Sequence, residues 1–189
     1  MALADLLKLS KTKDVQKMGL SEERIRAAIP IARQYIAYWR EYPDMFVDFL
    51  CGDNPENFHL FFYQRIFLRA AMRHRYAYAT FPRAFSKSFL SVLILILRCI
   101  LYPNSHLFVT TGGKEQAASI TKEKFDEICK LIPGVKKEVN WDRGKTKTSK
   151  DNIEIIFKSG SKLDIIAARQ SSRGKRATGG LMEECILID

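Results

Sequence analysis

The chain has 189 residues, enough for one domain with a sizeable apolar core. Hydrophobic residues make up 47% of it and charged residues 28%, which is typical of a soluble globular protein. The formal net charge of +10 favours a polyanionic partner, most often a nucleic acid, without identifying one.

The cysteines and histidines are scattered along the chain. No C-x-x-C pair is present, so the cysteines indicate buried thiols in a reducing cytoplasm rather than disulfides or a metal site. The longest apolar run, 89–101, is shorter than the ~20 residues that a membrane span requires, and Arg98 interrupts it. We therefore expect a buried helix there and no membrane partner.

The N-terminal quarter predicts helices. Ser21 can cap a helix whose apolar residues recur at three- and four-residue steps through 25–39. Pro30 should kink this helix or mark a later start. A short helix at 45–50 and a turn-rich stretch at 52–55 follow. We expect residues 1–55 to form a helical extension and residues 56–189 to form the main domain.

Helix and strand patterns alternate through the main domain. In chain order we predict a helix at 60–73, a strand at 76–80, a loop at 81–87, an apolar helix at 88–101, a strand at 106–111, a helix at 114–131, a hairpin of strands 152–158 and 162–168, and a strand from residue 181 into the end of the chain. This alternation indicates an α/β fold with a mainly parallel central sheet flanked by helices.

The loop before the apolar helix has the context of a phosphate-binding P-loop. It consists of Phe81, Pro82, Arg83, Ala84, Phe85, Ser86, Lys87 and Ser88. Backbone amides between a strand and a helix N-terminus can cradle phosphates. Lys87 would reach the β- and γ-phosphates of ATP, and the Ser88 hydroxyl would bind Mg²⁺.

This loop departs from the standard P-loop pattern, which has glycine where this chain has Phe81 and Ser86. Taken alone, Ser-Lys-Ser predicts a polar turn capped by serine. The residues around the loop favour phosphate binding instead.

Two of those residues lie close to the loop in sequence. A glutamine such as Gln64 can pair with both N6 and N7 of adenine, although most glutamines simply lie on a helix surface. Arg83 can stabilise transition-state charge as an arginine finger does, or can merely add positive potential to the loop.

Adjacent carboxylates follow near the end of the chain. ATP hydrolysis requires one carboxylate for the Mg²⁺ shell and a second to activate water, and Glu183 and Glu184 can divide these tasks. A solvated acidic pair is the alternative. A rival assignment uses the apolar run 185–188 ending in Asp189, which has the pattern of a Walker B strand.

Together, these motifs resemble the large terminase subunit of tailed phages, the ATPase of the DNA-packaging motor. The resemblance covers residues 58–184 and is carried, in order, by Tyr63-Gln64, the loop 83–88, Thr110-Thr111, Arg173-Gly174 and Glu183-Glu184. Each motif is weak by itself, and their order and spacing carry the resemblance.

The resemblance implies roles for these residues. Gln64 would contact adenine, Arg83 would be the P-loop arginine, Glu183 would stand where the family has a metal-binding Asp, and Glu184 would be the catalytic carboxylate. It also implies a P-loop ATPase core that lacks its C-terminal part and the family's nuclease domain. We expect such a chain to show little ATPase activity alone.

The implied function is packaging of double-stranded DNA into proheads within the bacterial host cytoplasm, powered by ATP and Mg²⁺. The implied partners are the portal protein, the small terminase subunit and further copies in a ring. Two alternatives remain: a helicase-like ATPase, and a nucleic-acid-binding remnant that does not hydrolyse ATP. The positive charge and the degenerate loop favour the second alternative.

Overall fold

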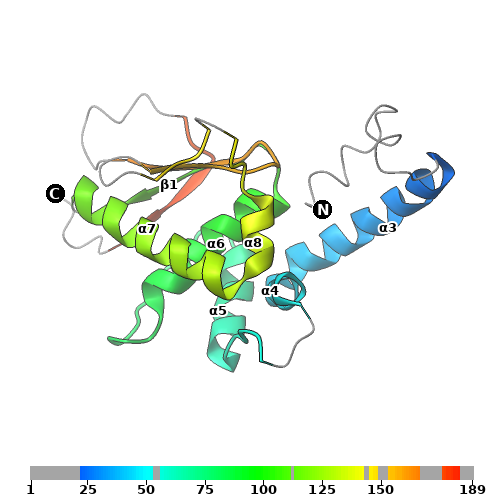
Figure 1. Cartoon of the computed structure of the whole chain (residues 1–189). Helices are drawn as coiled ribbons and strands as arrows, with labels where there is room; N and C mark the ends of the chain where they lie inside the picture. Colours follow the sequence, from blue (N-terminus) through cyan, green and yellow to red (C-terminus); the bar gives the residue numbers. More distant parts are fainter. Residues whose placement is uncertain are drawn as a thin grey trace.

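The computed structural model describes residues 22–52, 56–111, 113–142, 145–148, 153–166 and 176–183. Over these residues the fold is α/β, with helices packed against a sheet of five strands in the order β2-β3-β4-β1-β5 (Figure 1). The α/β expectation is therefore confirmed. The sheet is mixed rather than mainly parallel, which corrects that part of the prediction.

Helices α3 and α4 are the first described elements of the chain. Helix α3 (Glu22–Glu41) continues through Pro30, so the predicted later start is wrong. Figure 1 shows α3 extending away from the sheet, and its C-terminal half buries the apolar side chains of Ile36 and Trp39. Helix α4 (Pro43–Cys51) is amphipathic and buries Phe46 and Val47 in the core that the sheet also shares.

An ion-pair cluster joins α4 to α5 (Phe62–Arg73). Asp44 is fully buried, and both its oxygens accept hydrogen bonds from Arg69 at 2.7 and 2.8 Å. Arg65 donates to Asp44 and also binds Asp48 with two hydrogen bonds. Because the buried carboxylate is paired on both oxygens, its burial costs little and α5 is held in place beside α4.

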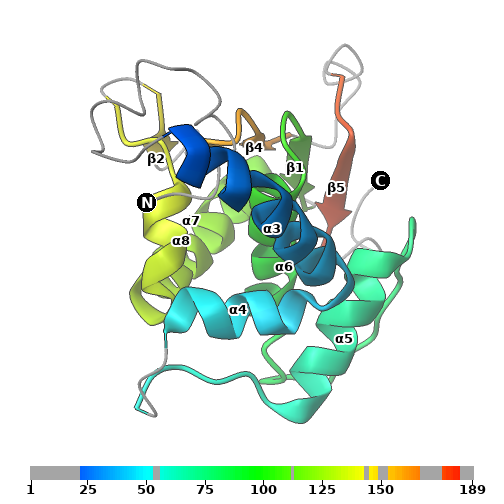
Figure 2. The same ribbon diagram turned by 90° about the vertical axis from the view of Figure 1, so that its right-hand side faces the viewer.

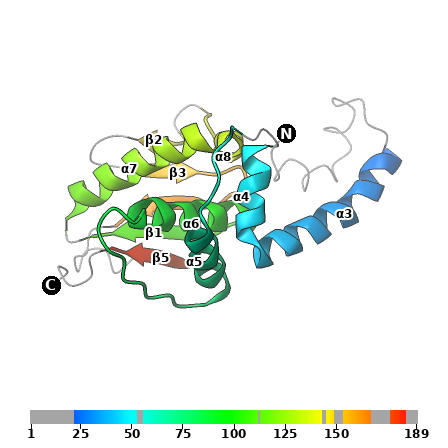
Figure 3. The same cartoon turned by 90° about the horizontal axis from the view of Figure 1, so that it is seen from below.

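Helix α6 (Lys87–Leu101) forms the centre of the core. Ten of its 15 residues are buried, as expected of a helix that is apolar on nearly every face. Figures 1 and 3 show α6 and α7 (Lys114–Leu131) on the same face of the sheet. Helix α8 (Pro133–Glu138) follows α7, and Gly134 allows it to contact α4, since a Cβ there would lie 2.7 Å from the Leu50 backbone.

The sheet combines parallel and antiparallel pairs. Strand β1 (His106–Thr110) runs parallel to β4 (Lys162–Ile165) on one side and to β5 (Gly179–Met182) on the other. Strand β3 (Ile153–Ile156) pairs antiparallel with β4 and with the short β2 (Lys147–Thr148). The predicted hairpin around Gly160 is confirmed, and its tight turn has φ 84° at that glycine.

Two predicted strands differ from the structure. Residues 76–80 are not a strand, because within the described ranges no other strand pairs with them. The last strand, β5, starts at Gly179, before the predicted position, and ends at Met182, and residues 184–189 of the predicted strand lie outside the described residues. Figure 2 shows β5 at the edge of the sheet, beside β1.

Candidate functional site

The loop before α6 has an unusual backbone. Ala84 and Ser86 have positive φ values, 63° and 55°, in the left-handed region that favours glycine. Among the residues that the structure describes, only Asn104 shares this property without being a glycine. Ser86 is the N-cap residue of α6, yet its side chain makes no capping hydrogen bond. The alternative of a serine-capped turn is therefore not supported.

Strained non-glycine positions gather at functional sites more often than elsewhere. A loop of alternating backbone handedness at a helix start turns successive amides toward one point, which makes a concave site for anions. The positive helix end of α6 reinforces this potential. The loop thus combines two positive φ values with a helix start, features that anion-binding loops share, although glycine is absent from it.

The sheet brings Glu183 to this loop. The Glu183 amide donates to the Thr110 carbonyl at 3.0 Å, which fixes Glu183 just beyond the end of β5. The Ser88 hydroxyl donates to Glu183 Oε1 at 2.5 Å, and Lys87 Nζ lies 3.5 Å from the same oxygen. Three residues that the sequence assigned to one site are therefore in contact.

Glu183 is 5% exposed, and its second oxygen, Oε2, is buried without a hydrogen-bond partner. A buried carboxylate oxygen left without a donor is costly, so it indicates a missing partner. Carboxylate and hydroxyl oxygens are the ligands that Mg²⁺ prefers, and it takes few of them from protein. Glu183 and Ser88 therefore fit Mg²⁺, even though no group of three or more candidate ligands occurs within the described parts of the chain.

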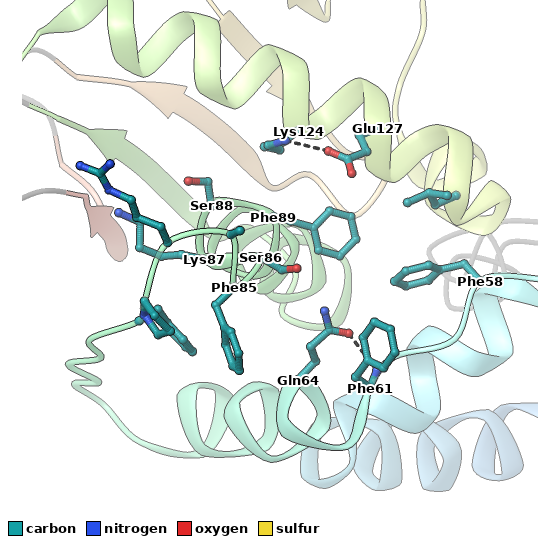
Figure 4. Close-up of a pocket in the computed structure, with 15 residues that line it drawn as sticks. Phe58, Phe61, Gln64, Phe85, Ser86, Lys87, Ser88, Phe89, Lys124 and Glu127 are labelled. Atoms are coloured by element: carbon teal, nitrogen blue, oxygen red, sulfur yellow. Dashed lines mark hydrogen bonds and ion pairs between the residues drawn. The ribbon is translucent and has the colours of Figure 1, made fainter.

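A pocket of about 570 Å³ opens beside the loop (Figure 4). Its walls come from the segment before α5, the first turn of α5, the loop itself, the start of α6, and one face of α7. The lining residues are Phe58, Phe61, Gln64, Phe81, Pro82, Arg83, Ala84, Phe85, Ser86, Lys87, Ser88, Phe89, Lys124, Glu127 and Leu131. The volume and the mixture of aromatic and cationic walls suit a phosphorylated ligand with a flat apolar part.

Gln64 lines the pocket but is not a surface glutamine, since it is only 3% exposed. Its Oε1 accepts a hydrogen bond from the Phe61 amide at 2.9 Å, which satisfies a free donor at the start of α5. Its Nε2 donates to the Tyr63 hydroxyl at 3.3 Å. Gln64 thus holds the first turn of α5, and its contact with adenine stays a prediction.

Aromatic side chains of α5 pack against the aromatic side chains of the loop. Tyr63 packs against Phe85 with ring centroids 4.3 Å apart, and Phe67 meets Phe81 edge-on at 4.9 Å. Phe81 occupies a position where the standard loop has glycine, and Phe85 precedes the other such position, Ser86. Their packing onto α5 stabilises a loop conformation that glycine would otherwise make easy.

Arg83 lines the pocket with an exposed side chain. Its position leaves it free to approach a bound phosphate, and its finger role stays a prediction. Arg173, Gly174, Glu184 and Asp189 all lie outside the described residues, so the choice between Glu184 and Asp189 also stays open.

Sequence reasoning missed one wall of the pocket. Lys124 and Glu127 on α7 form an ion pair at 2.9 Å that faces the pocket opposite Gln64 (Figure 4). A charged pair on an amphipathic helix looks like any solvated face, so no local signal distinguishes it. The packing of α7 beside α6 brings this ion pair to the loop.

Comparison of the sequence with protein-family models and with curated proteins finds no match. Among the described residues, no helix is long and apolar enough to cross a membrane. The functional interpretation therefore depends on the residues and their geometry.

Proposed function

We propose that this chain binds Mg-ATP at the loop 81–88 and is the ATPase module of a phage or prophage terminase large subunit, which powers the packaging of double-stranded DNA. The contact between Ser88, Lys87 and Glu183 carries the proposal. Residues 95 positions apart in sequence meet there, and they are a hydroxyl and a carboxylate that would hold Mg²⁺ and a lysine that would bind phosphate.

Each residue has a separate task. Lys87 provides a point charge for the β- and γ-phosphates, and the amides at the start of α6 bind phosphate oxygens. Ser88 and Glu183 would provide hard oxygen ligands, and a bound cation would give the unpartnered carboxylate oxygen of Glu183 a partner. Mg²⁺, when bound, neutralises charge that develops on the phosphates. Lys87 and Ser88 both contact Oε1 of Glu183 and leave Oε2 to the cation.

The remaining roles follow the resemblance. Arg83 stabilises charge during phosphoryl transfer, and Glu184 orients and deprotonates the attacking water. The partners are double-stranded DNA, the portal protein, the small terminase subunit and further copies in a ring, in the cytoplasm of the bacterial host. The net charge of +10 suits DNA and also favours the second candidate, a nucleic-acid-binding remnant without hydrolysis.

Calorimetric titration of the purified chain with ATP, in Mg²⁺ and in EDTA, tests the proposal. We expect binding to weaken by tenfold or more, roughly 1.4 kcal/mol, when Mg²⁺ is removed. Ser88→Ala and Glu183→Gln should abolish this Mg²⁺ effect, whereas Ser91→Ala, one turn further along α6, should keep it. ATP binding that is identical with and without Mg²⁺ would contradict the metal assignment, and no binding at all would favour the remnant.

A further inference from the structure

The wall of the pocket on α7 carries a charged pair that the proposed function does not use. Lys124 Nζ lies 2.9 Å from Glu127 Oε2 and 3.0 Å from Glu123 Oε1. Lys124 is 25% exposed and Glu127 42%, whereas Glu123 is 68% exposed and does not line the pocket. Lys124 therefore holds the Glu127 carboxylate at the pocket and the Glu123 carboxylate outside it.

Aromatic rings lie at the same side of the pocket as Glu127. Figure 4 shows Lys87 and Ser88 at one side and Phe58 and Phe61 at the other, with Phe89 between Glu127 and Gln64. The Phe58 and Phe89 rings pack with centroids 5.6 Å apart, and Phe61 is 67% exposed. A ligand with phosphates at the loop would thus place its flat base among these rings, where stacking is favourable.

The polar groups beside those rings are a fixed donor and a fixed acceptor. The carboxylates of Glu127 and Glu123, which accept hydrogen bonds from Lys124, raise the pKa of the lysine, so Lys124 stays a cationic donor at neutral pH. Glu127 has an acceptor-only carboxylate with several lone pairs, of which Lys124 uses one. Lys124 and Glu127 can therefore form hydrogen bonds with the polar edge of a base.

Adenine is the purine that complements this pair. Along its N7 edge, adenine presents a ring-nitrogen acceptor next to an amino donor, whereas guanine presents two acceptors. A carboxylate beside that edge accepts from the adenine amino group and repels the guanine carbonyl oxygen. Gln64 on the opposite wall already uses Oε1 for the Phe61 amide, which leaves Glu127 as the stronger acceptor.

We propose that Glu127, held in place by Lys124, recognises the base of the bound nucleotide by accepting a hydrogen bond from the 6-amino group of adenine. This inference rests on the proposed function, because it requires phosphates at the loop. It adds a specificity-determining residue on α7, a helix to which the motifs of the sequence assigned no role.

The test compares three ligands on the full chain by calorimetry: ATP, purine riboside triphosphate, which lacks the 6-amino group, and inorganic tripolyphosphate. In the starting chain we expect ATP to bind about tenfold more tightly than purine riboside triphosphate, the value of one charge-assisted hydrogen bond. In Glu127→Ala the two should bind equally. Tripolyphosphate should bind both chains alike.

Glu123→Ala is the matched control, because it removes the other carboxylate partner of Lys124 on the exposed side. It should keep the tenfold preference. Glu127→Gln retains an acceptor oxygen without the charge, so its preference should fall between those of the starting chain and Glu127→Ala. Both positions are partly exposed, and thermal unfolding verifies that each variant is folded.

Two results separate this inference from the proposed function. If tripolyphosphate and ATP bind through Lys87 but Glu127→Ala keeps the tenfold preference, the base assignment is wrong and the phosphate loop stands. If Glu123→Ala loses the preference as fully as Glu127→Ala, the effect comes from Lys124 and not from Glu127, which also overturns the assignment. If neither ligand binds the starting chain, the proposed function fails and this inference fails with it.

Discussion

Ser88 and Glu183 are joined by a hydrogen bond from the serine hydroxyl to a carboxylate oxygen, although Ser88 lies in the first turn of α6 and Glu183 just beyond the end of β5. Thr110 in β1 holds the Glu183 amide in place. The parallel pairing of β1 and β5 thus determines that the second half of the site meets the phosphate loop. A change that shifts β5 should disturb the site as much as a change in the loop.

The left-handed backbone at Ser86 gives the first prediction. Ser86→Gly should raise the free energy of unfolding by roughly 1 kcal/mol, because glycine has no Cβ to strain at φ 55°. No capping hydrogen bond is lost, since the serine side chain makes none. ATP affinity should stay equal or increase, and chemical denaturation together with calorimetry measures both quantities.

Ser91→Gly is the control for the same substitution in the interior of α6. Glycine in a helix interior costs about 0.5–1 kcal/mol, so this variant should lose stability. A large loss of ATP affinity in Ser86→Gly would show that the serine hydroxyl takes part in binding and that its presence is not merely tolerated.

The buried carboxylate of Asp44 gives a prediction about pH. Burial raises the pKa of Asp44, but hydrogen bonds and charge attraction from Arg69 and Arg65 outweigh it and hold the pKa below its ordinary value. A carboxyl group with a lowered folded-state pKa adds stability above its unfolded pKa, near 4, and loses it as pH falls through the folded value. The free energy of unfolding should therefore decrease below about pH 4.

Asp44→Asn should lower stability at pH 7 by about 3–5 kcal/mol, because Arg65 and Arg69 lose their buried partner. It should also flatten the acid dependence of unfolding. Asp142→Asn, at a carboxylate that is 74% exposed, should change neither. An acid dependence that is the same in Asp44→Asn as in the starting chain would locate the titrating group elsewhere.

The choice between the two catalytic carboxylates can be decided by turnover. Whatever ATP hydrolysis the chain retains should fall by about 10²-fold or more in Glu184→Gln, with ATP binding intact, because a general base is lost. Asp189→Asn should change neither ATP hydrolysis nor ATP binding. Steady-state phosphate release, with and without double-stranded DNA, measures this, and the opposite pattern would favour Asp189 as the Walker B residue.

Local patterns predicted much of the fold. The apolar run of α6, the hairpin at Gly160 and the strand β1 all follow from periodicity and turn residues within a few positions. Residues 76–80 have a strand pattern, but a strand requires a partner, and pairing is decided by residues far away in sequence. The sheet is mixed rather than mainly parallel for the same reason, because strand pairing depends on residues far apart in sequence.

The candidate site was predictable in its sequence-local part. Lys87 and Ser88 are adjacent in one short motif, and the structure shows that Glu183 contacts both, while its role as a metal ligand stays a prediction. The capping role of Gln64 was not predictable, since the same residue type serves in a cap and in base recognition. Lys124 and Glu127 resemble a solvated helix face until α7 packs beside α6.

Binding of Mg-ATP by the starting chain and by Lys87→Ala tests the central claim most directly. Lys130→Ala, at an exposed lysine near the end of α7, serves as the charge-matched control. Calorimetry should show that Lys87→Ala abolishes Mg-ATP binding, because the charge that meets the β- and γ-phosphates is gone, while Lys130→Ala binds as the starting chain does. Equal affinities for the starting chain and Lys87→Ala would contradict the assignment of residues 81–88 as a phosphate-binding loop.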